Sequence, residues 1–458
     1  MSSGIDWRIP PSMPRWLAEV PADRPVVLLL RHSVRDYLPP GDAGYVLPIN
    51  AVGTQLGQEL GRMLQGRLRT LHTSPLVRCR QTAEVLRESA NASLPIVADP
   101  LLGDPGVYVV DGHRAWANWE ALGHEGVMAH LVSAEDALVG MARPDAAARY
   151  LVHHMLATAG EVPGLHIFVT HDSLVTATAA RLLDRPLGVD AWPWYLEGAF
   201  FWRDQTGLHA AYQNEHRAAI TEPLCGFEET DVLEFARREI VRTVGPDCKA
   251  RFFLAGGAFK TLLTGRPPRD IDLWAASTED RACLIQQLVQ RGGVPLSARP
   301  FSEAFEIAGR VVEVPHKVEP STLEERLGHF DLALSAVGVE HRPADHWRVC
   351  IHPLARRSVQ LRKVLLLKPL ANWKYALTTL ERMRRYAAEL DFICPIDEEA
   401  EVWRVFEAQP PDMRARMLDR FGQTCFGGFD VREGALARCG LSLDRHLVGW
   451  QAVSQAEC

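Results

Sequence analysis

The stretch FLAGGAFKTLLTGRPPRDIDLW carries two glycines, Gly256 and Gly257, and then two aspartates, Asp270 and Asp272. The apolar residues before the glycines predict a strand that ends in a turn, where a bare backbone lets a phosphate approach; Lys260, in the helix expected next, could reach a triphosphate. One apolar residue separates the aspartates, so both carboxylates share one face of a strand. Such a pair can hold divalent cations that clamp a triphosphate and activate a hydroxyl, which we favour over a solvated strand end.

A second set of chemically capable residues lies at predicted strand ends in the first half of the chain. It comprises Arg31, His32, Arg35, Arg78 and His171. Arginine forks match phosphate oxygens, and a histidine among them can attack phosphorus. A second histidine can stabilise the developing charge, and an acid must protonate the leaving oxygen.

Alternating strand and helix patterns surround this second set. PVVLLLRH and residues 165–170 read as buried strands, and VGTQLGQELGRMLQGR reads as an amphipathic helix. This order predicts a three-layer α/β domain with a mainly parallel sheet and its ligand site at the carboxyl ends of the strands. We expect the segment 103–150, with Trp116 and Trp119, to cover that site.

Composition narrows the class of protein. The chain has 458 residues, a net charge of -7 and nine cysteines. The cysteines form no CxxC pair, which fits a reducing compartment, and the charge excludes a strongly basic nucleic-acid coat. We find no signal-peptide pattern and no apolar run long enough for a membrane span, so we predict a cytoplasmic enzyme with no membrane partner.

We predict five segments along the chain. The second half should be an α+β domain with a helical extension, because strand patterns give way to helical ones. The alternating basic residues at 354–368 read as a solvated strand face or an RNA track. The segments are an N-terminal tail (1–22), an α/β domain (23–215), a helical connection (216–250), an α+β domain (251–345) and a mostly helical C-terminal region (346–458).

The motifs LRHSVRD, SPLVRCRQTAEVL and VTHDSLV, in this order, resemble the histidine phosphatase superfamily. The resemblance implies a metal-independent phosphomonoesterase with His32 as the nucleophile, and phosphoryl binding by the second set of residues named above. Serine at 33 replaces the usual glycine of the family and could crowd the site. For the acid we favour Asp172, of the His-Asp motif, and keep Asp104 as the alternative.

The stretch LAGGAFKTLLTGRPPRDIDLW resembles the polymerase-β-type nucleotidyltransferases, in particular the bacterial poly(A) polymerase and CCA-adding group. The resemblance implies two Mg²⁺ ions on Asp270 and Asp272, an NTP substrate, and a third carboxylate on the strand GRVVEVPHK. That carboxylate is Glu313, with Asp331 as the alternative and otherwise a nucleotide-pocket residue. The family's base-reading helix has no clear counterpart here, which argues against CCA addition to tRNA.

These resemblances predict a bifunctional enzyme, with a histidine phosphatase domain at 23–215 and a nucleotidyltransferase palm domain at 251–345. It would hydrolyse a phosphomonoester and would transfer a nucleotidyl group from an NTP to a hydroxyl. The acceptor could be an RNA end during repair or processing, or a small-molecule metabolite. A third alternative is that one half is a non-catalytic regulatory module.

Overall fold

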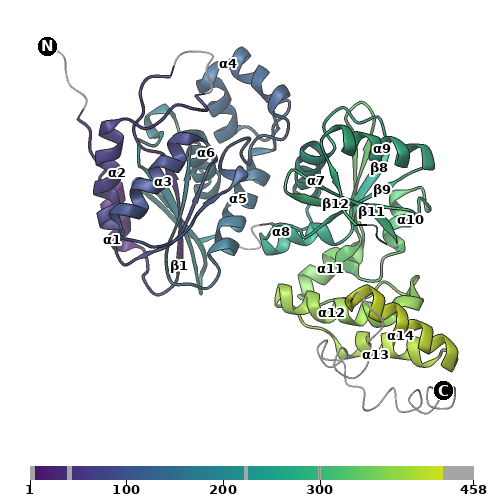
Figure 1. Cartoon of the computed structure of the whole chain (residues 1–458). Helices are drawn as coiled ribbons and strands as arrows, with labels where there is room; N and C mark the ends of the chain where they lie inside the picture. The colour runs from purple at the N-terminus through teal and green to yellow at the C-terminus, as the bar shows by residue number, and fades with distance from the viewer. Residues whose placement is uncertain (1–5, 39–43, 221–224, 298, 300, 427–458) are drawn as a thin grey trace. The chain divides into compact units, whose positions relative to one another are not determined.

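The computed structural model describes residues 6–38, 44–220, 225–297, 299 and 301–426, and these form two compact units (Figure 1). Within the described residues, the first unit runs to Pro246 and also includes Thr261–Pro267. The second unit comprises Asp247–Lys260 and the described residues from Pro268 onward. Residues 427–458, which belong to the segment expected to be mostly helical, lie outside the described residues.

The sheet of the first unit has seven strands in the order β3-β2-β4-β1-β5-β6-β7. The first four are mutually parallel, as expected, and the last three are antiparallel because they follow one another through short hairpin turns. The strands are β1 (Pro25–Arg31), β2 (Leu68–Thr73), β3 (Ile96–Ala98), β4 (Gly164–Thr170), β5 (Gly198–Asp204), β6 (Gly207–Tyr212) and β7 (Glu215–Ile220).

Helices cover both faces of this sheet, which confirms the three-layer prediction. Figure 1 shows α1, α2 and α3 on one face, and α5 and α6 on the other. The helices are α1 (Ser12–Glu19), α2 (Ala51–Met63), α3 (Val77–Ser89), α4 (Gly112–Ser133), α5 (Pro144–Ala159), α6 (Asp172–Leu183), α7 (Glu229–Thr243) and the one-turn α8 (Thr261–Thr264).

Alternation along β1 builds the core on the first of these faces. Val26, Leu28 and Leu30 are fully buried and belong to the same apolar cluster as Leu60 of α2 and Leu86 of α3. Their partners on the other strands are equally buried, so the central strands read as continuous apolar runs. Because the strands are anchored in this core, the polar residues that follow each strand are held in defined positions.

The short segment that carries α8 belongs to the first unit, although it lies between the glycine turn and the aspartates of the second. His154 of α5 is buried, and its Nδ1 lies 3.0 Å from the Gly265 carbonyl oxygen. Its Nε2 pairs with Asp99 at 2.8 Å. Gly265 has φ +66°, and a Cβ there would lie 2.6 Å from the His153 carbonyl oxygen, so glycine is required at this turn.

The second unit contains another seven-stranded sheet, in the order β10-β11-β12-β9-β8-β13-β14. Only β9 and β12 pair in parallel; the other neighbours are antiparallel. Its strands are β8 (Phe252–Ala255), β9 (Ile271–Ala275), β10 (Val294–Pro295), β11 (Ser302–Ile307), β12 (Arg310–Pro315), β13 (Val337–Arg342) and β14 (His346–Ile351). The strands expected before the glycines, at the aspartates and around Glu313 are therefore present.

Helices complete the second unit. They are α9 (Thr278–Gln290), α10 (Leu323–Gly328), α11 (Pro353–Leu361), α12 (Ala376–Leu390), α13 (Ile396–Glu407) and α14 (Pro411–Phe426). The prediction of a strand face at 354–368 was wrong, because the first part of this segment is α11, with Pro353 in its first turn. None of the helices in the described ranges is long and apolar enough to cross a bilayer.

Candidate active sites

The two histidines of the first unit meet because their strands are neighbours. His32 follows β1 and His171 follows β4, and the parallel register pairs Arg31 with Thr170 at the ends of these strands. The backbone N–H of His32 donates to the Thr170 carbonyl at 2.9 Å. As a result the two imidazole rings lie 5.5 Å apart, centroid to centroid, at the carboxyl edge of the sheet.

Hydrogen bonds fix which nitrogen of His32 is free to react. Nδ1 lies 2.8 Å from the Ser33 carbonyl, which can only accept, so Nδ1 carries the proton. Nε2 therefore presents its lone pair, and the Arg78 Nε–H donates to it at 3.2 Å. Burial, followed by the positive fields of His171 and Arg31, lowers the pKa of His32 well below its ordinary value. The ring is neutral at physiological pH, as a nucleophile must be.

His171 is oriented by two partners. Arg78 Nη2 donates to its Nδ1 at 3.3 Å, so Nε2 carries the proton and faces Ser74 Oγ at 3.2 Å. Burial and the charge of Arg78 lower the pKa of His171 to about 3. The ring is therefore a neutral donor, placed to stabilise charge beside His32.

The arginines of this site keep unused donors. Arg31 pairs with Asp172 at 2.9 Å and lies 4.2 Å above the Tyr195 ring. In the described part of the chain, the Nε atoms of Arg31 and Arg35 are buried and have no hydrogen-bond partner. Buried N–H groups without a protein partner are rare, and a phosphoryl oxygen would satisfy them.

Serine at 33 does not crowd the site. Its hydroxyl donates to the Gly53 carbonyl at 2.6 Å, and its backbone N–H donates to Thr82 Oγ1 at 3.0 Å. The side chain is fully buried and turned away from the histidines. Replacement of the family's glycine is accommodated by these two contacts.

The two candidate acids occupy different surroundings. Asp172 begins α6 and is held by Arg31; although burial opposes ionisation, the positive charges of Arg31 and His124 keep its pKa well below the ordinary range. Asp104 is exposed and lines a pocket of about 220 Å³ that also contains Arg78 and His171. Trp116 and Trp119 of α4 line the same pocket, so the segment expected to cover the site does contribute to it.

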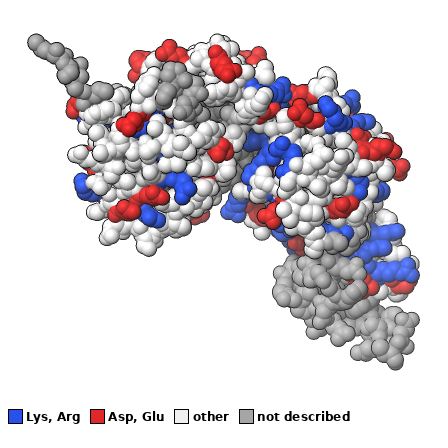
Figure 2. All heavy atoms as spheres, turned by 45° about the horizontal axis from the view of Figure 1, so that its top comes forward, with Lys and Arg blue, Asp and Glu red and all other residues white. Residues whose placement is uncertain are grey.

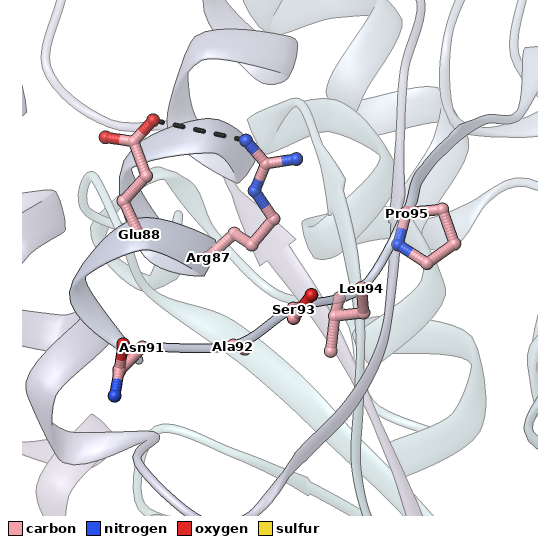
Figure 3. Close-up of a pocket in the computed structure, with 7 residues that line it drawn as sticks. All are labelled: Arg87, Glu88, Asn91, Ala92, Ser93, Leu94 and Pro95. Atoms are coloured by element: carbon pink, nitrogen blue, oxygen red, sulfur yellow. Dashed lines mark ion pairs between the residues drawn. The ribbon is translucent and has the colours of Figure 1, made fainter.

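A larger hollow of about 500 Å³ lies away from these residues. Figure 3 shows it at the end of α3 and in the following loop, with Arg87 and Glu88 joined by an ion pair of 4.0 Å. None of the residues predicted to do chemistry lines it, and we assign it no role.

In the second unit, the strand register brings the predicted carboxylates together. Glu313 of β12 is the direct cross-strand partner of Asp272 in β9, so both side chains share one face. Asp270 lies two residues earlier, on the same side. Burial, and then the neighbouring Asp270, raise the pKa of Asp272 to about 7. Such crowding of acids is costly without a counter-charge.

Carboxylate oxygens suit a hard cation such as Mg²⁺, but Asp270, Asp272 and Glu313 are not arranged as a complete metal site. Glu313 pairs closely with Arg299 and accepts from Ser302 Oγ at 2.8 Å. Among the described residues, no three histidine, cysteine or acidic side chains converge in a metal-binding geometry. Asp270 and Asp272 are therefore the pair that fits a cation, and Glu313 could join only by leaving Arg299.

The glycine turn is packed closely against Tyr386 of α12. Gly256 has φ +114°, and a Cβ on Gly257 would lie 2.6 Å from the Tyr386 hydroxyl. The helix expected after the turn is only a 3₁₀ segment, Gly257–Lys260, followed by α8. Lys260 ends the 3₁₀ segment, with its Nζ 3.6 Å from the Tyr386 ring centre and paired to Glu389.

Asp331 acts within the protein core. It is buried and accepts from Thr379 Oγ1 at 2.7 Å and from Arg382 Nη1 at 3.1 Å. Burial alone would lower the pKa of Arg382, but Asp331 and Tyr386 raise it, so this guanidinium stays charged. Asp331 therefore fastens α12 to the segment between α10 and β13, and its side chain is already engaged.

We expect Gly257→Ala to lower the melting temperature by several degrees, because the new methyl group would collide with the Tyr386 hydroxyl. Differential scanning calorimetry would measure the change. Adding Tyr386→Phe should restore most of the loss, since it removes the colliding atom. Gly328→Ala is the matched control, because nothing lies within 4 Å of a Cβ at that position. A loss that the double variant does not recover would contradict this account.

Some residues of these sites were not foreseen. Tyr195, under the Arg31 guanidinium, lies far from any motif in the sequence, and Glu389, the partner of Lys260, carries no local signal. Ser74 could have been found, because it belongs to the SPLVRCRQT motif that also supplies Arg78. Residues from the quoted motifs were predictable, and those contributed by distant loops were not.

Comparison with known protein families supports the interpretation of the first unit. Residues 27–194 match the model of the histidine phosphatase superfamily (branch 1), so this part of the chain is similar to that superfamily. The predicted resemblance is confirmed, and His32, Arg78 and His171 all lie within the match. A search of curated proteins finds no match to the chain.

Solved structures similar to the chain include a tRNA-processing enzyme (apo form I), with 17% identity and a TM-score of 0.33. They also include the Thermotoga maritima CCA-adding enzyme complexed with tRNA, with 15% identity and a TM-score of 0.31. The first covers 50% of this chain and 60% of its own; the second covers 44% and 50%. Likenesses this low carry no argument about activity, which rests on the residues themselves.

Proposed function

We propose that the first unit is a metal-independent phosphomonoesterase that works through a phosphohistidine. The observation that carries the proposal is the neutral His32, whose Nε2 lone pair faces Arg78, in a site where the Nε–H groups of Arg31 and Arg35 are buried without a partner. A phosphoryl group bound to those donors would lie against the His32 Nε2 atom.

The reaction would proceed in two steps. His32 Nε2 forms a bond to phosphorus while the bond to the leaving oxygen breaks, and an acid protonates that oxygen. Arg31, Arg35, Arg78 and His171 stabilise the charge on the phosphoryl oxygens. Water then attacks phosphorus, releases inorganic phosphate and restores the free imidazole.

The structure favours Asp104 as the acid, with Asp172 as a residue that positions Arg31. A carboxyl group held ionised by an ion pair is a poor proton donor, whereas Asp104 lines the pocket that the leaving group would enter. Both assignments of the acid remain testable with one pair of substrates.

We expect Asp104→Asn to slow hydrolysis of an alkyl phosphate by about 10²-fold and to leave p-nitrophenyl phosphate little changed, because nitrophenolate departs without a proton. Asp172→Asn should impair both substrates alike, through Arg31. The measurement is kcat/KM for the two esters. The opposite pattern, with Asp172→Asn selective for the alkyl ester, would return the acid role to Asp172.

For the second unit we infer a Mg²⁺-dependent nucleotidyltransferase. The observation that carries this inference is the shared face of Asp270, Asp272 and Glu313, next to the turn at Gly256. Magnesium bound there would neutralise the triphosphate and lower the pKa of the attacking hydroxyl. The glycine turn would leave room for the phosphates, and Lys260 could contribute its charge if it left Glu389.

An RNA 3′ end is the acceptor we favour. Figure 2 shows several groups of basic side chains on the C-terminal unit, and helix α11 with the turn after it carries Arg356, Arg357, Arg362 and Lys363. Basic side chains along one segment attract a phosphate backbone.

A small-molecule acceptor is the second candidate, and the net charge of -7 is the observation in its favour. Labelled NTPs with Mg²⁺ and cell extract, split into RNA and small-molecule fractions, separate the two. RNA labelling that falls steeply with salt supports the first candidate, and salt-insensitive labelling of a small compound supports the second. Label in neither fraction would contradict nucleotidyl transfer and favour a regulatory palm.

A further inference from the structure

We propose that the phosphatase unit selects phosphomonoesters whose leaving group is flat, aromatic and uncharged. The inference rests on the proposed phosphatase function and adds the substrate class. Its basis is the pocket of about 220 Å³ between α4 and the loop at residues 103–109.

The pocket opens on the atoms that would hold the phosphoryl group. Arg78 and His171 line it, and Arg78 Nε is 3.2 Å from the nucleophilic nitrogen of His32. A phosphoryl group in contact with His32 and Arg78 would therefore direct its ester substituent into this pocket. The group that fills the pocket is the one that departs.

The walls of the pocket are mainly aromatic and aliphatic. Tyr45, Tyr108, Trp116 and Trp119 contribute rings. The Tyr108 hydroxyl is bonded to Thr178 at 2.9 Å, and Trp116 Nε1 donates to Glu120 at 3.0 Å, so the polar atoms of these two rings are already engaged. A ligand in the pocket would therefore contact the apolar surfaces of these rings. The aliphatic residues that complete the lining are Leu76, Val109, Leu131, Met141 and Leu174.

Charge argues against a second anionic group on the substrate. Among the described residues that line the pocket, Arg78 is the one permanent cation, and the phosphoryl group would use it; Asp104 is the one carboxylate. No lysine precedes Lys249 in the sequence. A carboxylate or second phosphate would therefore be desolvated without a partner, which is costly. The volume suits a single ring system, below the usual range for drug-sized ligands.

The test compares three esters of primary alcohols, so that the reactivity of the leaving oxygen is similar. They are benzyl phosphate, propyl phosphate and 2-carboxyethyl phosphate. We expect kcat/KM for the benzyl ester to exceed that of the propyl ester by about tenfold or more, with the carboxyethyl ester lowest. Equal values for the benzyl and propyl esters would overturn the inference while leaving the phosphatase function intact.

Variants locate the preference. Trp119→Ala and Trp116→Ala should each reduce the ratio of kcat/KM for the benzyl ester to that for the propyl ester to about threefold or less. Trp347→Ala, the same change in the second unit, should retain the full preference. A preference that both pocket variants keep would overturn the assignment to this pocket.

A binding measurement separates failure of the inference from failure of the proposed function. If no ester is hydrolysed, the proposed function fails, and calorimetry with benzylphosphonate and propylphosphonate still probes the pocket. Tighter binding of the benzyl compound, lost in Trp119→Ala, would support the aromatic pocket. Equal binding of the two phosphonates would overturn it.

Discussion

Replacing His32 by alanine is expected to lower phosphate release from a simple phosphomonoester by roughly 10⁴-fold or more, because it removes the nitrogen proposed to form the covalent intermediate. Brief incubation with a ³²P-labelled ester should label the unaltered protein with an acid-labile, alkali-stable phosphate, and the variant should remain unlabelled. The imidazole lies beside three positively charged or donor groups, so its loss also leaves Arg78 Nε without a partner.

Controls separate chemistry from folding in this experiment. His216→Ala removes an exposed imidazole from β7, which is three strands away from β1 in the sheet, and should retain activity. Circular dichroism should show that His32→Ala keeps its helical content. Phosphate release by His32→Ala at the level of the unaltered protein would eliminate the phosphohistidine mechanism for this unit.

Replacing Asp272 by asparagine is expected to abolish nucleotidyl transfer, with a loss of roughly 10³-fold or more, because the amide cannot supply the charge that holds Mg²⁺. Incorporation of label from an α-³²P NTP would measure it. Glu306→Gln, at an exposed position of β11, is the matched control and should keep activity. Full activity in Asp272→Asn would remove this face from the proposed mechanism.

The same substitution should stabilise the metal-free protein above neutral pH. The pKa of Asp272 is raised to about 7 in the folded state, from an ordinary value of 3.8. Between these values the folded protein keeps a proton that the unfolded chain has released, so the unaltered protein loses stability as pH rises. Melting curves in EDTA should show Asp272→Asn melting higher at about pH 8 and equally at about pH 4. A lower melting point at pH 8 would show that the carboxylate stabilises the fold.

Local sequence determined a large part of this protein. The apolar runs before Arg31, His171 and Gly256 had to form buried strands, and the residues just after them had to lie at strand ends. The alternation around Ile271 placed Asp270 and Asp272 on one face. These inferences hold because side-chain periodicity and chain turns are set over a few neighbouring residues.

Tertiary structure decided which distant groups complete each site. The pairing of β9 with β12 puts Glu313 beside Asp272, and the Arg31–Asp172 ion pair sets the two candidate acids apart. The pocket of about 220 Å³ combines residues of α4 with Arg78 of α3 and with His171, which follows β4. Residues Pro353–Leu361 form a helix whose buried residues are Ala355 and Ser358, three positions apart, a spacing that the strand interpretation did not take into account. Partners, charge states and cavities depend on contacts between residues far apart in the chain, and no local pattern encodes them.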